Sequence, residues 1–390
     1  MCPPQITDIG SVSVEIQALD MAEIGAELSD FLNELERRFQ DQLEENGRGE
    51  HGWAGRLHCA ADGYLKRPLL YEKSWVFRAV LSSGEHRWHG GSYVVSQRQQ
   101  WVGGRVQQHV FGYLARIPEE ARSLGIGGRF FLHIHDFFSQ DGQLGSGIVA
   151  RDNHASLKMT MRSGSVVGMR FAGEMVEYAL LRDAFPSITV PNASLRVLDT
   201  AEKADAVFER MFGNHSMRVA DSDVIMRLPQ HAGHFVLEAT GSEAGVSLWR
   251  PDYSVMVTGD GRRVAYLLVY NMWTTGEGGE LLLLDLVGRM LRHQGLEHAI
   301  ALLTRSTPSQ AVRPSPLPGL AVYAANPLER LIRPHAVGFE EELVRLSFTS
   351  FLHDGRTVDQ YLPFPKIFYD PRDLSTLVIF HSMSEFPMMI

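Results

Sequence analysis

The feature that most constrains the fold is a cluster of glycines between an apolar segment and a segment with helical periodicity. The stretch PEEARSLGIGGRFF (118–131) places Gly125, Gly127 and Gly128 within four residues. Glycines at this density cost backbone entropy, so they predict a positive φ angle or a close approach of another group to the backbone. Successive N–H groups at the start of a helix attract anions. The loop therefore predicts either a phosphate cradle, with Arg122 and Arg129 at its ends, or a plain strand-to-helix turn.

Two familiar phosphate loops do not fit this stretch. No Lys-Ser or Lys-Thr pair follows the glycines, as a Walker loop requires. The strand expected before the glycines comes late in a series of antiparallel-looking strands, whereas a dinucleotide-binding loop opens a βαβ unit. A phosphate cradle in this chain therefore belongs to another architecture.

Composition narrows the class of protein. The 390 residues predict roughly two to three domains. A net charge of −9 and a pI near 6.0 argue against binding nucleic acid through a basic face. The only cysteines, Cys2 and Cys59, can form neither a disulfide framework nor a four-cysteine zinc site. No apolar run approaches about 18 residues and the N-terminus has no signal-like pattern, so we expect a cytoplasmic protein without a membrane span.

Hydrophobic periodicity predicts alternating strands and helices in the first half. We expect strands at 11–19, 74–83, 90–102, 105–117, 146–150, 166–173 and 175–181, and helices at 22–43, 129–140 and 155–163. The glycine pairs at 90–91 and 103–104 are typical of hairpin turns. Gly164 is placed to end the last of these helices, and the proline-bounded stretch 185–192 looks like a linker.

The second half repeats this order with weaker signals, and so resembles a divergent second copy. We expect strands at 234–240, 245–250, 253–258, 262–271, 280–287 and 300–305, and a helix at 288–299. This helix is entered through a single glycine, Gly288, which predicts that the second copy has lost the phosphate cradle. The expected domains are 1–190 and 211–390, joined by a linker at 191–210.

Two motifs in the first half resemble those of the GNAT superfamily of acyl-CoA-dependent N-acyltransferases. The first is R-x-x-G-x-G at 122–127, and the second is D-N-H-A-S-L-K-M-T-M-R-S-G at 152–164, in which Asn153, Ala155 and Gly164 have the family's spacing. The resemblance implies an α+β fold with two tandem GNAT-like domains, each a mixed, mostly antiparallel sheet flanked by helices. It also implies acetyl-CoA or another acyl-CoA as co-substrate.

The same resemblance implies a set of acyl-CoA contacts. In the family, backbone amides of the strand before the loop serve the thioester carbonyl, and the loop amides bind the pyrophosphate. The corresponding residues here are Leu114, Ala115, Arg116, Arg122, Leu124, Gly125, Ile126, Gly127, Gly128, Arg129, Asn153 and Ser156. The family often has a tyrosine seven residues after the asparagine to protonate the leaving thiolate, and here that position is Thr160. Either another group or water takes this role, or the acid is dispensable.

A base that deprotonates the acceptor amine is expected on the strand before the loop. His109, Phe111 and Tyr113 share one face of that strand by its period of two. His109 has a pKa suited to this role near neutral pH, although a hydrogen-bonded strand histidine is the alternative. Tyr113 is a candidate acid or a core residue. His231 and His234 could line an acceptor pocket or be solvent-facing loop histidines.

A metal site is not expected. His133 and His135 stand two apart on a predicted helix, where they point to different faces, and Asp136 does not complete a ligand set.

The layout of the whole chain is similar to that of HOOKLESS-type and histidine N-acetyltransferase-like proteins. The shared pieces are short: a D-x-x-x-x-L…G-x-F-V segment at 223–236, GVSLW at 245–249 and I-F-Y-D-P-R at 367–372. This implies acetyl transfer to the amine of a small molecule such as an amino acid, by a monomer or homodimer. The alternatives are acylation of a peptide or protein amine, and a catalytically silent acyl-CoA-binding regulator.

Overall fold

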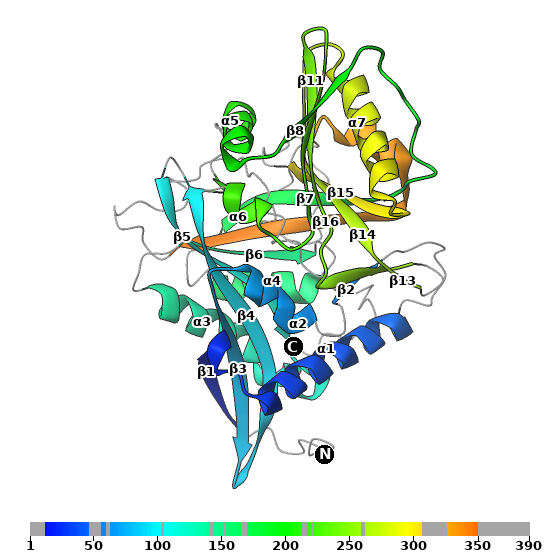
Figure 1. The fold of residues 1–390 in the computed structure, drawn as a ribbon. Helices are drawn as coiled ribbons and strands as arrows, with labels where there is room; N and C mark the ends of the chain where they lie inside the picture. Colours follow the sequence, from blue (N-terminus) through cyan, green and yellow to red (C-terminus); the bar gives the residue numbers. More distant parts are fainter. Residues whose placement is uncertain are drawn as a thin grey trace.

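The computed structural model describes residues 12–46, 56–59, 63–102, 105–139, 144–150, 153–164, 170–212, 217–219, 222–258, 262–305 and 326–349. The chain has an α+β fold built on one large mixed sheet (Figure 1). A smaller sheet of β13, β12 and β2 lies beside it. The C-terminal motif expected at 367–372 lies outside the described residues.

The first half follows the expected order of strands and helices. Its elements are β1 (Ser13–Asp20), α1 (Ala26–Asn46), β2 (Arg56–Cys59), α2 (Gly63–Lys66), β3 (Lys73–Ser83), β4 (His86–Val102), β5 (Arg105–Arg116), α3 (Ile126–Ser139), β6 (Leu144–Ala150), α4 (His154–Gly164) and β7 (Arg170–Leu181). The helix expected at 155–163 is confirmed and ends at Gly164. The two strands expected at 166–173 and 175–181 are one strand, β7.

The second half runs through the same order of elements, with two additional strands, β12 and β13, between β11 and β14. Its elements are β8 (Ser194–Leu198), α5 (Ala201–Phe212), β9 (Met217–Val219), α6 (Ser222–Met226), β10 (His231–Ala239), β11 (Ser242–Trp249), β12 (Ser254–Val257), β13 (Arg263–Val264), β14 (Tyr266–Thr275), α7 (Gly279–Gln294), β15 (His298–Arg305), α8 (Glu329–Ile332) and β16 (Ala336–Thr349). The stretch 191–210, expected to be a linker, contains β8 and most of α5.

The two halves exchange their last strands. The large sheet has the order β1-β3-β4-β5-β6-β16-β7-β15-β14-β11-β10-β8. Thus β16 of the second half pairs with β6 of the first, and β7 of the first half pairs with β15 of the second. Figure 1 shows β6, β16 and β7 crossing the middle of the molecule between the two lobes. Each half consequently completes the other's sheet. The strand beside β6 is β16 of the second half, and the strand beside β15 is β7 of the first half.

The hairpin turn expected at Gly90 and Gly91 was wrong. Gly90 and Gly91 lie within β4, where Ala79 pairs with Gly91 but Val80 pairs with His89, so Gly90 forms a bulge. A Cβ on Gly90 would lie 2.6 Å from Leu81 Cγ, which explains the glycine. The turn between β3 and β4 instead uses Gly84, which has φ +60°.

The strand expected at 280–287 is the first half of helix α7. Leu282, Leu283 and Leu286 are buried, whereas Leu281 is 57% exposed. This burial follows a helical period and not the alternation of a strand. A run of four leucines suits a buried strand equally well, so the sequence alone could not decide between the two.

The sheet of the first half is covered by different helices on its two faces. On one face, α3 packs Ile126, Phe130 and Ile134 against Phe77 and Val110. On the other face, α1 packs Leu28 and Leu32 against residues that include Phe111 and Tyr113. The region between these two layers, at the end of β5, holds the candidate site.

Candidate functional site

Strands β5 and β6 run parallel and then part. Their pairing extends from His109 opposite Leu144 to Gly112 opposite Gly147. Just beyond this last pair, β5 carries a bulge: Tyr113 pairs with Val94 and Arg116 with Ser92, so two residues of β5 stand opposite the single residue Tyr93 of β4. We call the region around Gly112 and Gly147 the strand fork. At this fork a gap opens between β5 and β6, while the other neighbouring strands of the sheet remain paired.

The bulge lies at Leu114 and Ala115, where acyl-CoA contacts were expected. Leu114 has φ +52°, an uncommon value for a residue with a branched side chain. A bulge of this kind turns the backbone out of the ladder and re-aims its groups. The bulge therefore makes the backbone at the strand fork a candidate partner for a carbonyl oxygen.

The glycine-rich loop joins β5 to α3 on one side of the fork. A short 3₁₀ helix, Glu119–Leu124, ends at Gly125, which has φ +67°. Helix α3 then begins at Ile126, and Arg129 N–H donates to Gly125 O at 3.2 Å. The N–H groups of Ile126, Gly127 and Gly128 precede this first helical bond, as orphan donors do at any helix start. The loop thus has the backbone geometry of an anion site.

Space is available over this loop. A Cβ on Gly125 would meet nothing within 4 Å, and a Cβ on Gly127 would meet only Met159 at 3.4 Å and Ile117 at 3.5 Å. Arg122 and Arg129 are exposed at the two ends of the loop. Leu124 packs beneath it against the α3 core.

The second half also has a glycine loop, contrary to the sequence-based expectation. Gly276 and Gly278 precede α7 and Gly279 is its first residue, whereas Gly288 lies in the middle of that helix. This loop is filled, however: Gly278 N–H donates to Ser242 Oγ at 3.1 Å, and Gly279 N–H donates to Gly276 O at 3.2 Å. Two amides at the start of α7 therefore already bond to the chain's own groups.

The asparagine motif forms the start of helix α4. Asn153 Oδ1 accepts from Ser156 N–H at 3.0 Å, and Asn153 O accepts from Leu157 N–H at 2.9 Å. Asn153 is thus a helix cap, a role that its side chain suits well. Thr160, two turns into α4, is only 5% exposed.

The side chain of Arg116 has a structural partner that the sequence did not reveal. Its Nε donates to Glu36 Oε2 at 2.6 Å and a second guanidinium nitrogen donates to Glu36 Oε1 at 3.3 Å. The two side chains are 6% and 5% exposed. This buried pair ties α1 to the end of β5, so only the backbone of Arg116 remains as a candidate acyl-CoA contact.

The α1 face of the fork is lined by polar groups in a buried setting. His109 is fully buried, with Nε2 2.8 Å from Ser146 Oγ. The hydroxyl of Tyr113 lies 2.7 Å from Ser96 Oγ, and the guanidinium of Arg67 lies 4.1 Å from the centre of the Tyr113 ring. The predicted shared face of His109 and Tyr113 is thus consistent with these contacts.

His109 does not lie beside the bulge. Leu114 is five positions further along β5, which corresponds to about 16 Å along an extended strand. A proton could reach His109 from the fork only through intermediate groups. His109 is therefore placed for a relay and not for direct contact.

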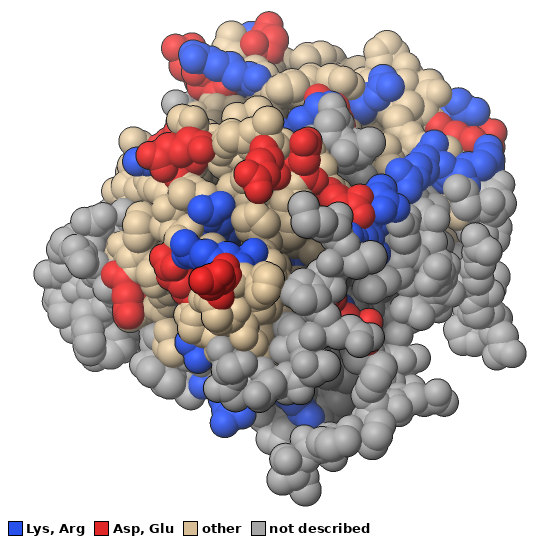
Figure 2. All heavy atoms as spheres, turned by 90° about the horizontal axis from the view of Figure 1, so that it is seen from below, with Lys and Arg blue, Asp and Glu red and all other residues tan. Residues whose placement is uncertain are grey.

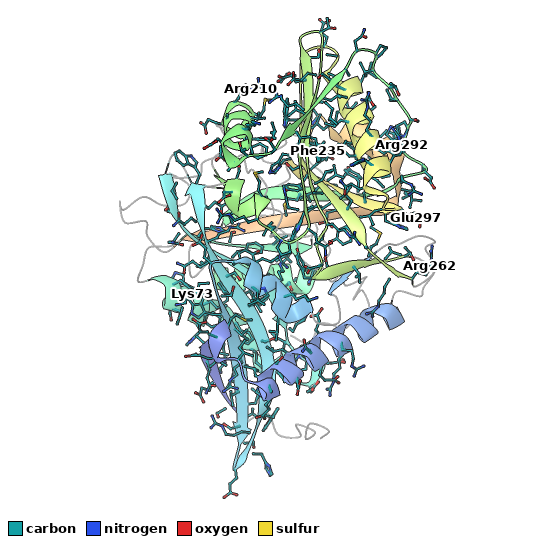
Figure 3. All side chains as sticks on the ribbon, viewed as in Figure 1. Lys73, Arg210, Phe235, Arg262, Arg292 and Glu297 are labelled. Carbon is teal, nitrogen blue, oxygen red and sulfur yellow. The ribbon has the colours of Figure 1, made fainter. Side chains whose placement is uncertain are left out.

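His231 and His234 lie on strand β10 of the second half, and not on a loop. Their rings are 4.6 Å apart, and His234 Nδ1 lies 2.6 Å from Ser247 Oγ. Burial lowers the pKa of His231 to about 4 and that of His234 to about 3. Helix α5 covers this side, held by Arg210, which pairs with Glu243 at 2.6 Å; Figure 3 labels Arg210 and the neighbouring strand residue Phe235.

Other charged groups are distributed without a metal-like cluster. Among the described residues, no three His, Cys, Asp or Glu side chains converge as metal ligands. His135 Nδ1 lies 3.4 Å from Asp136 Oδ1. On the face seen in Figure 2, the described acidic and basic side chains intermingle. No helix within the described part of the chain combines the length and apolar character needed to cross a membrane.

Comparisons with known proteins give matches in structure only. No protein-family model and no curated protein matches the sequence. Yeast N-myristoyltransferase with bound myristoyl-CoA aligns over 94% of this chain and 85% of its own, at 12% identity and a TM-score of 0.49. A tandem GNAT protein from the clavulanic acid biosynthesis pathway aligns over 87% and 99%, at 11% identity and a TM-score of 0.48. A GCN5-related N-acetyltransferase from Kribbella flavida aligns over 87% and 72%, at 11% identity and a TM-score of 0.43.

The order of elements in this chain agrees with the expected fold class. Each half has a series of antiparallel strands, then a glycine loop and helix, then a strand parallel to the one before the loop. The fold is α+β, with two halves that share this order of elements. The structure adds the exchange of β7 and β16, which the sequence did not predict.

Proposed function

We propose that this protein is an acyl-CoA-dependent N-acyltransferase whose first half binds the acyl-CoA. One observation carries the proposal: in the first half, a strand fork with a bulge at Leu114 stands beside an unfilled glycine loop at the start of α3. A thioester carbonyl and a pyrophosphate require these two features at neighbouring positions.

The contrast between the halves supports the choice of the first half. The second half has the same bulge, at Asn271 with φ +50°, and the same end to its parallel pairing, at Val269 opposite Ala301. Its loop amides are used by Ser242 and Gly276, and the acidic Glu277 and Glu280 flank it. A phosphate group would meet a Gly279 amide that already bonds to Gly276 O, and negative charge from the two glutamates. The second half is better suited to forming one side of the acceptor pocket.

In the proposed reaction, a neutral amine attacks the carbonyl carbon of the thioester. The backbone at Leu114 and Ala115 stabilises the negative charge that develops on the carbonyl oxygen. The amides of Ile126, Gly127 and Gly128, with Arg122 and Arg129 at the ends of the loop, hold the pyrophosphate. His109 takes up the amine proton through intermediate polar groups.

The acceptor that we propose is the amine of a small molecule such as an amino acid, and the donor is acetyl-CoA. The α1 face of the fork supports a compact polar acceptor, because Ser74, Ser96, Ser146 and Tyr113 place hydroxyls on it in a buried setting. These hydroxyls bond to one another, to His109 and to Pro68 O, so they give this face a fixed polar lining.

The experiment that tests this proposal measures acetyl-CoA binding by calorimetry and then thiol release with a panel of amines. The panel holds free amino acids, including histidine, polyamines and a short peptide. Binding followed by thiol release with one amine class would support the enzyme and name its acceptor. Release with the peptide alone would favour a macromolecular acceptor, binding without release would favour a silent regulator, and no binding would refute the proposal.

A further inference from the structure

The strand fork contains a phenol, the side chain of Tyr93, that sequence patterns alone do not single out. Tyr93 on β4 is the residue directly opposite the bulge of β5. A Cβ built on Gly112 would lie 2.7 Å from the Tyr93 hydroxyl, and one built on Gly147 would lie 3.9 Å from it. Gly112 and Gly147 form the last pair before the strands part. The hydroxyl of Tyr93 is therefore located at the fork itself.

The two glycines make room for this hydroxyl. Any side chain at Gly112 would collide with the Tyr93 ring, since its Cε1 and Cζ lie 2.8 and 3.1 Å from the built Cβ. The ring leans toward α3, with its centre 6.2 Å from that of Phe130. Tyr93 thus approaches the fork from the face of the sheet that carries α3, and α3 in turn contacts α4.

The second half shows that the fold does not require this arrangement. By the matching registers, Val246 of β11 stands opposite the bulge of β14, and Val269 and Ala301 form the last pair of its parallel strands. All three are buried apolar residues that pack in the α7 core. A tyrosine over two glycines is therefore specific to the half with the unfilled loop.

The state of the Tyr93 hydroxyl suits a proton donor. Among the described residues it has no hydrogen-bond partner, and the residue is only partly buried. Burial raises the pKa of Tyr93 to about 12, so the phenol keeps its proton at neutral pH. Thr160 on α4 is 5% exposed, and its hydroxyl is a far weaker acid than a phenol.

We propose that Tyr93 is the catalytic residue that hydrogen-bonds and protonates the leaving CoA thiolate. This inference rests on the proposed function. As the C–N bond forms, the C–S bond breaks and its electron pair passes to sulfur, which takes the phenolic proton. The amine nitrogen loses one proton overall, and an equivalent proton returns from solvent to the phenolate. No further co-reactant is needed.

The first test needs no turnover. The pKa of the thiol of bound CoA is measured from thiolate ultraviolet absorbance over a pH series, in the wild type and in Tyr93→Phe. A hydrogen bond from the phenol stabilises the thiolate, so Tyr93→Phe should raise the bound thiol pKa by about one unit. Tyr178→Phe is the control, because it removes a buried hydroxyl bonded to Glu329 in the second half.

The second test separates chemistry from binding. Tyr93→Phe should lower kcat with acetyl-CoA by roughly a hundredfold while the Kd for acetyl-CoA stays unchanged. When the donor is the acetyl thioester of a more acidic thiol, the thiolate can leave without taking up a proton. The loss of kcat in Tyr93→Phe should therefore largely disappear with that donor.

The outcomes distinguish this inference from the proposed function. Equal bound thiol pKa values in wild type and Tyr93→Phe, or an equal loss of kcat with both thioesters, would overturn the role of Tyr93 alone. Failure of the wild type to bind acetyl-CoA would refute the proposed function as well.

Discussion

The buried pair between Glu36 and Arg116 gives the sharpest prediction about how the site is held. Replacing Glu36 with alanine would leave a guanidinium that is 6% exposed without its bidentate carboxylate partner. Removing one member of a buried ion pair typically costs about 3–5 kcal/mol, because the remaining charge is desolvated and uncompensated. We therefore expect Glu36→Ala to lower the free energy of unfolding by about 3–5 kcal/mol.

The matched control lies on the same helix. Glu34 pairs with Arg37 and Arg38, but these side chains are 41–60% exposed. Exposed pairs contribute only about 0–1 kcal/mol, so Glu34→Ala should cost no more than that. Both variants are compared with the wild type by urea denaturation at neutral pH, using the midpoint and slope of each transition.

A double variant tests whether the cost of Glu36→Ala comes from the unpaired guanidinium of Arg116. The double variant Glu36→Leu with Arg116→Met replaces the pair with apolar side chains of similar volume, and we expect it to be much closer to the wild type than Glu36→Ala. If Glu36→Ala costs as little as Glu34→Ala, the guanidinium of Arg116 is not confined by this pair and the account of how α1 fixes the end of β5 is refuted.

Two further predictions concern proton equilibria. His109→Ala should lower thiol release by roughly tenfold at neutral pH with no change in acetyl-CoA affinity, because His109 acts through a relay; full activity across the pH range would remove it from the mechanism. Burial raises the pKa of Glu177 to about 8, so the folded state holds a proton that the unfolded state releases above pH 4.5, and stability falls as the pH rises between those values. Glu177→Gln should therefore gain stability relative to the wild type between pH 5 and pH 8, and denaturation curves that keep a constant difference over this interval would contradict that reasoning.

Local patterns were enough to predict most of the first half. The strands at 74–83 and 105–117 and the two helices that follow the glycine loop, expected at 129–140 and 155–163, follow from periodicity and are confirmed. These features depend on residues that are neighbours in sequence.

The features that the sequence did not reveal depend on distant partners. The exchange of β7 and β16 is set by pairing between strands more than 100 residues apart, for which no local signal exists. The partner of Arg116 lies 80 residues away. The glycine loop at 276–279 is hard to recognise from sequence, because the leucines after it suit a strand as well as a helix. The role of Tyr93 depends on glycines from two other strands.

The central claim is that the loop before α3 binds the pyrophosphate of an acyl-CoA, and one titration tests it most directly. Acetyl-CoA binding is measured by calorimetry for the wild type, Gly127→Glu and Gly278→Glu. The first variant places a carboxylate over the proposed cradle, where a side chain meets only ordinary contacts with Met159 and Ile117. The second makes the same charge change at the equivalent loop of the second half, which Ser242 already fills.

We expect the wild type and Gly278→Glu to bind acetyl-CoA with similar affinity, and Gly127→Glu to bind at least about tenfold more weakly. Thermal denaturation of each variant checks that it is folded. Equal affinity in Gly127→Glu and the wild type, or a loss of affinity confined to Gly278→Glu, would contradict the assignment of the acyl-CoA site to the first half.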